Sequence, residues 1–270
     1  MKKLRMIVSV IFVLSICLFI GFYIADAMKD DTRPVITIED DIIDVSLKME
    51  DSELLKGVTA YDEKDGDITS KIIIESVSKF TSEKISTVTY AVCDDDNHVA
   101  TAKRKIRFKD YTEPYFVIEN SMVFAVGEDV DIASSVSAFD CIDGDISDRV
   151  IITTTDYETN KVGVFKVSLK VTNSMGDTIY MDMPVYVEEK SVAAPEVKLK
   201  DYLVHIKAGE EYDLMGNVEG AVDENGEKLQ NVIIDSNYNP DNPGEYQAHY
   251  YTTDSQGREG HSILTIVVEG

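Results

Sequence analysis

Two short acidic segments contain the side chains whose types and spacing are best suited to chemistry. Asp62, Asp65 and Asp67 occupy the pattern Asp-x-x-Asp-x-Asp, and the same spacing recurs in a second segment. The residues of that segment are Asp140, Asp143 and Asp145. Clustered carboxylates repel one another unless a cation neutralises them, and Ca²⁺ takes six to eight oxygen ligands of this hard kind. The pattern therefore makes these six residues candidate Ca²⁺ ligands.

A purely structural role for the same segments is the alternative. In Asp-Gly-Asp the aspartates can cap backbone amides while the glycine supplies a positive φ. The spacing is not that of the twelve-residue EF-hand loop, and no bidentate glutamate is fixed by the sequence. The sequence favours turn formation for this reason, with Ca²⁺ binding as the alternative.

Two acids in the following linker extend the candidate site. Asp110 and Glu113 precede the second acidic segment, so an ion held there would stiffen the joint before it. A third segment, Asp223-Glu224-Asn225-Gly226-Glu227, keeps the turn but loses the acid spacing. We expect no ion in that third segment.

Three similar units position these segments. Pro34, Pro114 and Pro195 lie 80 and 81 residues apart, and each opens a short stretch of alternating apolar residues. Each unit then passes through an Ala-x-Asp and ends on an alternating strand, a four-residue turn and a last strand. Period-2 segments separated by Gly, Asn and Asp turns are typical of antiparallel β-sandwiches. The predicted units span residues 34–109, 114–188 and 195–269.

This layout resembles the bacterial surface Ig-like repeat, which recurs in exported Gram-positive proteins and in some insecticidal crystal toxins. The resemblance is carried by Ala-x-Asp-x-x-Asp-Gly-Asp-Ile-[Ser/Thr], and then by Gly-x-[Phe/Tyr] and Asp-x-x-Gly before the last strand. It implies an all-β fold of three tandem Ig-like sandwiches that act as spacers or binding modules, without enzyme activity. Fold alone never fixes function.

The N-terminal segment 1–28 predicts export. Lys2, Lys3 and Arg5 precede an apolar run from Met6 to Ile24, which is long enough to span a bilayer. Basic residues before the run place the N-terminus in the cytoplasm and the remainder outside, as a single-pass signal anchor. Ala25-Asp26-Ala27 also fits a signal-peptidase site, so secretion after cleavage is the alternative.

Charge and motif content narrow the partners. The net charge is −24, and the part after residue 28 carries 23 Lys and Arg against 49 Asp and Glu, or −26. Such acidity repels nucleic acid and anionic lipid. No nucleophile–base pair or metal–histidine motif is evident, so we expect no enzyme activity and no certain cofactor. His249 and His261 face each other if the last two strands pair, and the basic run Lys103–Arg107 is interpreted as protection of a sheet edge.

The third unit is rich in tyrosine and contains a candidate ligand-binding loop. Tyr238 and Asn239 lie in a polar segment where an aromatic side chain has no evident packing partner. Exposed tyrosine beside asparagine is typical of surfaces that recognise glycans or proteins. The sequence as a whole predicts a non-catalytic cell-surface adhesion or scaffolding module. The alternative is a Ca²⁺-stiffened rod or accessory subunit of a membrane complex.

Overall fold

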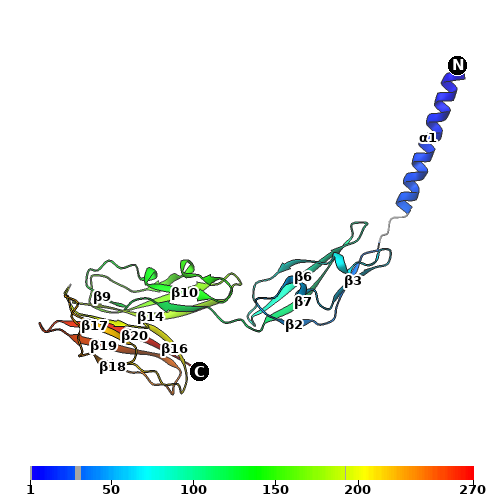
Figure 1. Ribbon diagram of the computed structural model, residues 1–270. Helices are drawn as coiled ribbons and strands as arrows, with labels where there is room; N and C mark the ends of the chain where they lie inside the picture. The colour runs from blue at the N-terminus through cyan, green and yellow to red at the C-terminus, as the bar shows by residue number, and fades with distance from the viewer. Residues whose placement is uncertain (1, 28–31, 192) are drawn as a thin grey trace. The chain divides into compact units, whose positions relative to one another are not determined.

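The computed structural model describes residues 2–27, 32–191 and 193–270, and it confirms an all-β chain preceded by one apolar helix (Figure 1). The predicted N-terminal segment ends at Met28, and both Met1 and Met28 lie outside the described residues. Two compact units follow from the contacts within the chain, residues 1–110 and residues 111–270. Each unit is described by itself. The proposed boundaries of the three repeats stay a prediction.

Helix α1 (Lys2–Ala27) is the one described helix long and apolar enough to cross a membrane. The candidate span runs from Arg5 to Ile24, and none of it is buried against the rest of the protein. Signal sequences share these properties, and both interpretations of the segment stay open.

The first unit contains one β-sandwich with two sheets of unequal size. One sheet has the order β1-β3-β4 and the other the order β2-β7-β6-β5. The strands are β1 (Val35–Ile38), β2 (Ile42–Val45), β3 (Val58–Asp62), β4 (Gly66–Asp67), β5 (Ile73–Val77), β6 (Ile85–Cys93) and β7 (Val99–Phe108). A short helix, α2 (Asp51–Leu54), and a 3-10 turn, η1 (Thr69–Lys71), complete the unit.

The second unit contains two sandwiches. The second sandwich of the chain pairs sheet β8-β10-β11 with sheet β9-β14-β13-β12. Its strands are β8 (Tyr115–Ile118), β9 (Val123–Ala125), β10 (Val136–Asp140), β11 (Gly144–Asp145), β12 (Ile151–Thr155), β13 (Gly163–Thr172) and β14 (Thr178–Glu188), with 3-10 turns η2 (Ile132–Ser135) and η3 (Ser147–Arg149). The third sandwich pairs sheet β15-β17 with sheet β16-β20-β19-β18. Its strands are β15 (Glu196–Leu199), β16 (Leu203–Lys207), β17 (Val218–Val222), β18 (Ile233–Ser236), β19 (Gly244–Thr253) and β20 (Glu259–Glu269).

Each sandwich contains one parallel pair that the prediction of antiparallel sheets did not include. β2 pairs in parallel with β7, β9 with β14, and β16 with β20. The cause is a strand that changes sheets: β1 pairs with β3 in one sheet, and the chain then crosses to place β2 beside β7 in the other. The remaining pairs are antiparallel, as period-2 patterning with short turns requires.

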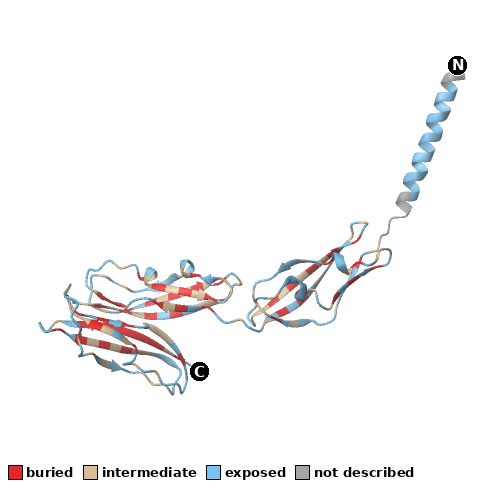
Figure 2. Cartoon of the chain, in the orientation of Figure 1, coloured by how far each residue is buried: buried red, intermediate tan, exposed pale blue. Residues whose placement is uncertain are grey.

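Burial alternates along most strands, so each sandwich encloses its own apolar core (Figure 2). Strand β20 is the exception, because side chains on both of its faces are buried. Leu264 and Ile266 belong to the core of the third sandwich, whereas Ile263 packs with the core of the second. The two sandwiches of the second unit therefore share apolar contacts.

Arg104 corrects the interpretation of the basic run as edge protection. β7 lies between β2 and β6, so it is not an edge strand. The Arg104 side chain points into the first core and is only 2% exposed. Its Nη1 donates to the Lys56 carbonyl at 2.8 Å, its Nε to the Tyr90 hydroxyl at 3.1 Å, and its Nη2 to the Leu54 carbonyl. These bonds satisfy a charge that burial alone would penalise heavily.

Candidate functional site

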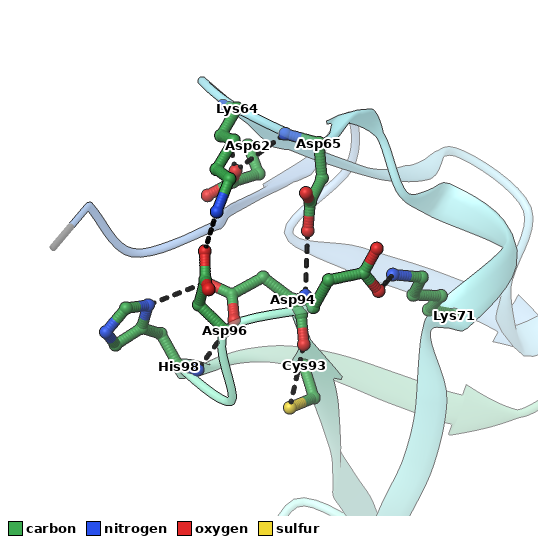
Figure 3. A network of polar contacts seen from close by, with 9 residues as sticks. Asp62, Lys64, Asp65, Lys71, Cys93, Asp94, Asp96 and His98 are labelled. Carbon is green, nitrogen blue, oxygen red and sulfur yellow. Dashed lines mark hydrogen bonds and ion pairs between the residues drawn. The ribbon is translucent and has the colours of Figure 1, made fainter. Parts of the chain in front are cut away.

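The first acidic segment forms the tight β3–β4 hairpin of the first sandwich. Asp62 pairs with Gly66 across this hairpin, and Gly66 has φ of 78°, a conformation that favours glycine. Asp62 is buried, and its Oδ1 accepts hydrogen bonds from the amides of Lys64 and Asp65, each at 3.0 Å (Figure 3). Asp67 likewise accepts from the Thr69 amide at 2.9 Å. The capping role described above is thus present.

A second turn, Asp94 to Asn97, meets this hairpin, as Figure 3 shows. The Asp95 amide donates to Asp65 Oδ2 at 2.7 Å, so carboxylates from separate segments lie at one pole of the sandwich. Lys71 Nζ lies 2.5 Å from Asp95 Oδ1, and Lys64 pairs with Asp96. These two lysines neutralise part of the acidity, and the sequence analysis did not identify them as part of the cluster.

The second acidic segment repeats the hairpin with a fuller set of hydrogen bonds. Asp140 Oδ1 accepts from the amides of Ile142 and Asp143, each at 2.9 Å, and its Oδ2 accepts from Asn173 Nδ2 at 3.0 Å. Asp143 Oδ2 accepts from Arg149 Nη1 at 2.6 Å. Burial opposes ionisation of Asp143, but hydrogen bonds from Ser174 and Arg149 hold the pKa of this carboxyl below its usual value.

Asp145, Asp110 and Glu113 occupy three different surroundings. Asp145 accepts from the amide and the hydroxyl of Ser147, and these bonds lower its pKa. Asp110 accepts from Ser46 Oγ at 2.6 Å and from the Leu47 amide at 2.8 Å, so both of its oxygens are engaged within the first unit. Glu113 belongs to the second unit, where it lines a surface cleft.

The third sandwich has a corresponding pole in which an arginine supplies the positive charge. Asp223 Oδ1 accepts from the amides of Asn225 and Glu227, each at 2.9 Å. Arg258 Nε donates to Asp254 Oδ2 at 2.6 Å, and its Nη2 donates to Glu224 at 2.9 Å. These two carboxylates raise the pKa of Arg258, with Glu224 as the larger cause.

The three poles differ most at the residue that begins the turn before the last strand. Asp94, Asn173 and Asp254 each accept the amide of the fourth following residue, so they hold equivalent places. In the second sandwich the Asn173 amide group satisfies Asp140. In the first sandwich no described residue hydrogen-bonds to the buried Oδ2 of Asp62. Asp94 instead takes His98 Nδ1 at 2.9 Å, so a histidine stands where the third sandwich has Arg258.

Substitution of Asp94 by asparagine and of Asn173 by aspartate tests the different roles of these two turn residues. Asp94→Asn should offer Asp62 the donor that Asn173 gives Asp140, and raise the free energy of unfolding of the first unit by about 1 kcal/mol. Asn173→Asp should lower that of the second unit by about 2 kcal/mol at pH 7, because it sets two carboxylates side by side. Mutual repulsion raises the pKa of such a pair, so this loss should shrink on acidification towards pH 4. Urea unfolding followed by hydrogen exchange measures the free energy of unfolding of each unit separately. Equal effects of the two substitutions would contradict the proposed difference between the two turns.

The candidate ligand-binding loop has a packing role that the sequence analysis missed. Tyr238 packs against the core of the third sandwich and contacts Tyr246 edge to face, with ring centroids 6.1 Å apart. Its hydroxyl donates to the Glu210 carbonyl at 2.9 Å. Asn239 Oδ1 accepts the Asp241 amide at 3.1 Å, which is a turn contact. The expectation that Tyr238 lacks a packing partner is therefore wrong, while ligand binding by this loop stays a prediction.

Cation binding by the acidic segments also stays a prediction. Across residues 2–27, 32–191 and 193–270, no group of three or more His, Cys, Asp or Glu side chains is arranged to hold a metal ion. The buried Oδ2 of Asp62 is the feature that best fits an additional cation, because a carboxylate oxygen without a donor is costly at such a position.

The predicted meeting of His249 and His261 is confirmed, and it forms part of a larger cluster. His249 Nδ1 lies 3.0 Å from His261 Nε2, and His261 Nδ1 lies 2.8 Å from Glu188 Oε1 of the second sandwich. Tyr251 stacks on His261 with ring centroids 4.5 Å apart, and Tyr186 contacts both histidines edge to face. The sequence analysis had no signal for Glu188 or Tyr186, because they belong to a different predicted repeat.

Comparison with known proteins gives partial similarities. No family model matches the chain. The chain is 28% identical over 224 residues to the pesticidal crystal protein Cry22Aa of Bacillus thuringiensis, covering 78% of this chain and 29% of that protein. It is 32% identical over 143 residues to an 81.3 kDa protein of Acholeplasma phage L2, covering 51% and 19%. The chain thus spans less than a third of these relatives.

Two solved structures give matches with low TM-scores. The CBM51-2 and INT domains of ZmpB from Clostridium perfringens match 55% of this chain and 40% of that structure, with 16% identity and a TM-score of 0.27. The extracellular domain of protocadherin GammaB4 matches 90% and 52%, with 13% identity and a TM-score of 0.23. These TM-scores lie far below 0.5, so neither structure superposes on the chain as a whole.

Proposed function

We propose that the chain is a non-catalytic adhesion or scaffolding module, held at the cell surface by helix α1. The carrying observation is an apolar helix without protein contacts, followed by acidic β-sandwiches. The polar clusters of these sandwiches are engaged mainly in turns and ion pairs. Such clusters stabilise loops, whereas a catalytic site needs a nucleophile, base or metal with an open place for substrate.

The free cysteines of the chain allow a direct test of location. Cys17 lies in α1, whereas Cys93 and Cys141 are exposed thiols of the first and second sandwiches. A membrane-impermeant maleimide applied to intact cells should label Cys93 and Cys141 but not Cys17. The double variant Cys93→Ser, Cys141→Ser should lose the label. Labelling only after cell lysis would refute surface exposure, and labelled protein in the medium alone would support secretion after cleavage.

Adhesion itself is tested by binding of the full chain in detergent micelles to arrays of glycans and matrix proteins. Saturable binding that survives chelator supports the proposal. Binding should require the folded second unit as a whole, because Ile263 and His261 tie the third sandwich to the second. Absence of binding to every class, together with cytoplasmic labelling, would overturn the proposal.

A Ca²⁺-stiffened rod is the second candidate, and the buried Oδ2 of Asp62 favours it. A cation that binds only the folded protein raises stability by mass action. Calorimetric melting of the full chain in millimolar Ca²⁺ and in chelator should then differ by several degrees for the first unit. Asp62→Asn should abolish the difference. Identical melting in both solutions would remove this candidate.

A further inference from the structure

The strongest unassigned feature is a cleft of about 790 Å³ in the second unit. Its walls come from β8 and β14 of the second sandwich and from β16, β19 and β20 of the third. The volume lies in the range of ligand-binding clefts, which is 300 to 1,000 Å³. It is also far larger than a bare ion needs, so the cleft suits an organic ligand.

The polar lining of the cleft is predominantly acidic. Four carboxylates line it, namely those of Glu113, Asp182, Glu245 and Glu269. His205 lies 3.1 Å from Glu269, and Lys166, outside the lining, lies 2.5 Å from Asp182. The lining therefore carries excess negative charge and complements a cation.

Glu245 is the carboxylate with the greatest need of a counter-charge. Among the described residues its carboxylate has no close ion pair, and Lys166 and His205 act on it only through their charges, which lower its pKa. Loss of surrounding water, and then the charge of Asp182, raise the pKa of this carboxyl above its usual value. A positive group beside Glu245 would oppose this rise, because its charge stabilises the ionised carboxylate.

Two exposed tyrosines also line the cleft. Tyr115 and Tyr180 are 52% and 70% exposed. Tyr115 is braced by Phe139, with ring centroids 5.9 Å apart. Aromatic faces attract guanidinium and ammonium groups, and arginine combines this contact with bidentate pairing to carboxylates.

From this combination we propose that the cleft binds an arginine-rich segment of a partner protein, with a guanidinium between Glu245 and Tyr180. The inference rests on the proposed adhesive function, because it names the ligand chemistry of that function. The charge of −24 on the whole chain would also attract such a partner and accelerate its association.

The test is titration of hexa-arginine amide into the full chain in detergent micelles, with hexaglutamine amide as the uncharged reference. We expect saturable binding to the first peptide alone. Glu245→Gln and Tyr180→Ala should each weaken it about fivefold, whereas Tyr180→Phe should leave it unchanged. Binding should also weaken as salt rises.

Matched controls separate the cleft from general acidity. Glu158→Gln and Tyr61→Ala change an exposed glutamate and an exposed tyrosine outside the cleft, and neither should weaken binding. Equal weakening by Glu158→Gln would overturn the proposal, as would stronger binding of a glucosamine oligomer than of the peptide. Purified protein is used and the probe is a single peptide class, so failure here leaves the results of the surface-labelling and array experiments standing.

Discussion

Arg104→Ala is expected to lower the free energy of unfolding of the first unit by about 4 kcal/mol. The substitution leaves a cavity in the core and removes the donor from the Lys56 carbonyl and from the Tyr90 hydroxyl. Urea unfolding followed by hydrogen exchange of residues 85–108 measures the loss, since these strands hold the core of that unit.

A control on the same strand makes this prediction specific. Arg107 is exposed and pairs with Asp44 at 2.8 Å, so Arg107→Ala should cost less than about 0.5 kcal/mol. Arg104→Met should be milder than Arg104→Ala, because Met183 and Leu264 hold the corresponding places opposite Val167 and Ala248. Equal losses for the two alanine variants would contradict the buried role of Arg104.

His261→Ala is expected to destabilise the second unit by about 3 kcal/mol. It removes the hydrogen-bond partner of Glu188 and of His249, and it removes the ring stacked on Tyr251. Hydrogen exchange of residues 259–269 under increasing urea measures the change. His205→Ala is the matched control, because that exposed histidine has one ion pair and should cost less than about 0.5 kcal/mol.

The same cluster makes the stability of the second unit depend on pH. Burial, and then the charge of His261, lower the pKa of His249, while the hydrogen bond from His261 lowers that of Glu188. The unfolded chain therefore binds more protons than the folded one as pH falls below 6.5, and again below 4.5. Stability is lost in both windows.

Variants identify which group causes each part of this loss. His249→Phe keeps an aromatic ring and should remove the loss that begins near pH 6.5. The charge of Asp235 raises the pKa of His249, so Asp235→Asn should lower that pKa further and steepen the loss of stability. Glu259, Tyr186 and Tyr251 also surround the cluster. A profile that His249→Phe leaves unchanged would assign the pH dependence to other groups.

The antiparallel hairpins and the acidic turns were predictable because short-range rules determine them, whereas the parallel pairs were not. Period-2 patterning and Asx-Gly turns fix each hairpin, and the matched spacing after Asp62 and Asp140 placed both segments at hairpin turns. The lysine partners of the first pole were not predictable, since a long flexible side chain can pair with any acid within reach. The hydrogen bonding of Asp62 and of Asp140 was likewise not predictable, because it depends on a turn residue far away in the sequence, such as Asn173 for Asp140.

One misinterpretation and one feature that was not predicted had signals in the sequence. Arg104 is two residues from Ile106, so strand alternation places both on the inward face. The run Ile263 to Val268 is almost continuously apolar, which is typical of a strand buried on both faces. Tyr238 gave no such signal, because its contact with Tyr246 joins a loop to a strand across the sandwich end.

The parallel pair in every sandwich also determines how such a chain would carry mechanical tension. In each case a strand near the start of the sandwich lies parallel to the last strand and is hydrogen-bonded to it. Force entering at one end and leaving at the other then slides the two strands along each other, so that their bonds are loaded together. Antiparallel ends would instead open one bond at a time. Under such tension the pairs β2–β7, β9–β14 and β16–β20 would therefore be loaded in shear and would resist separation.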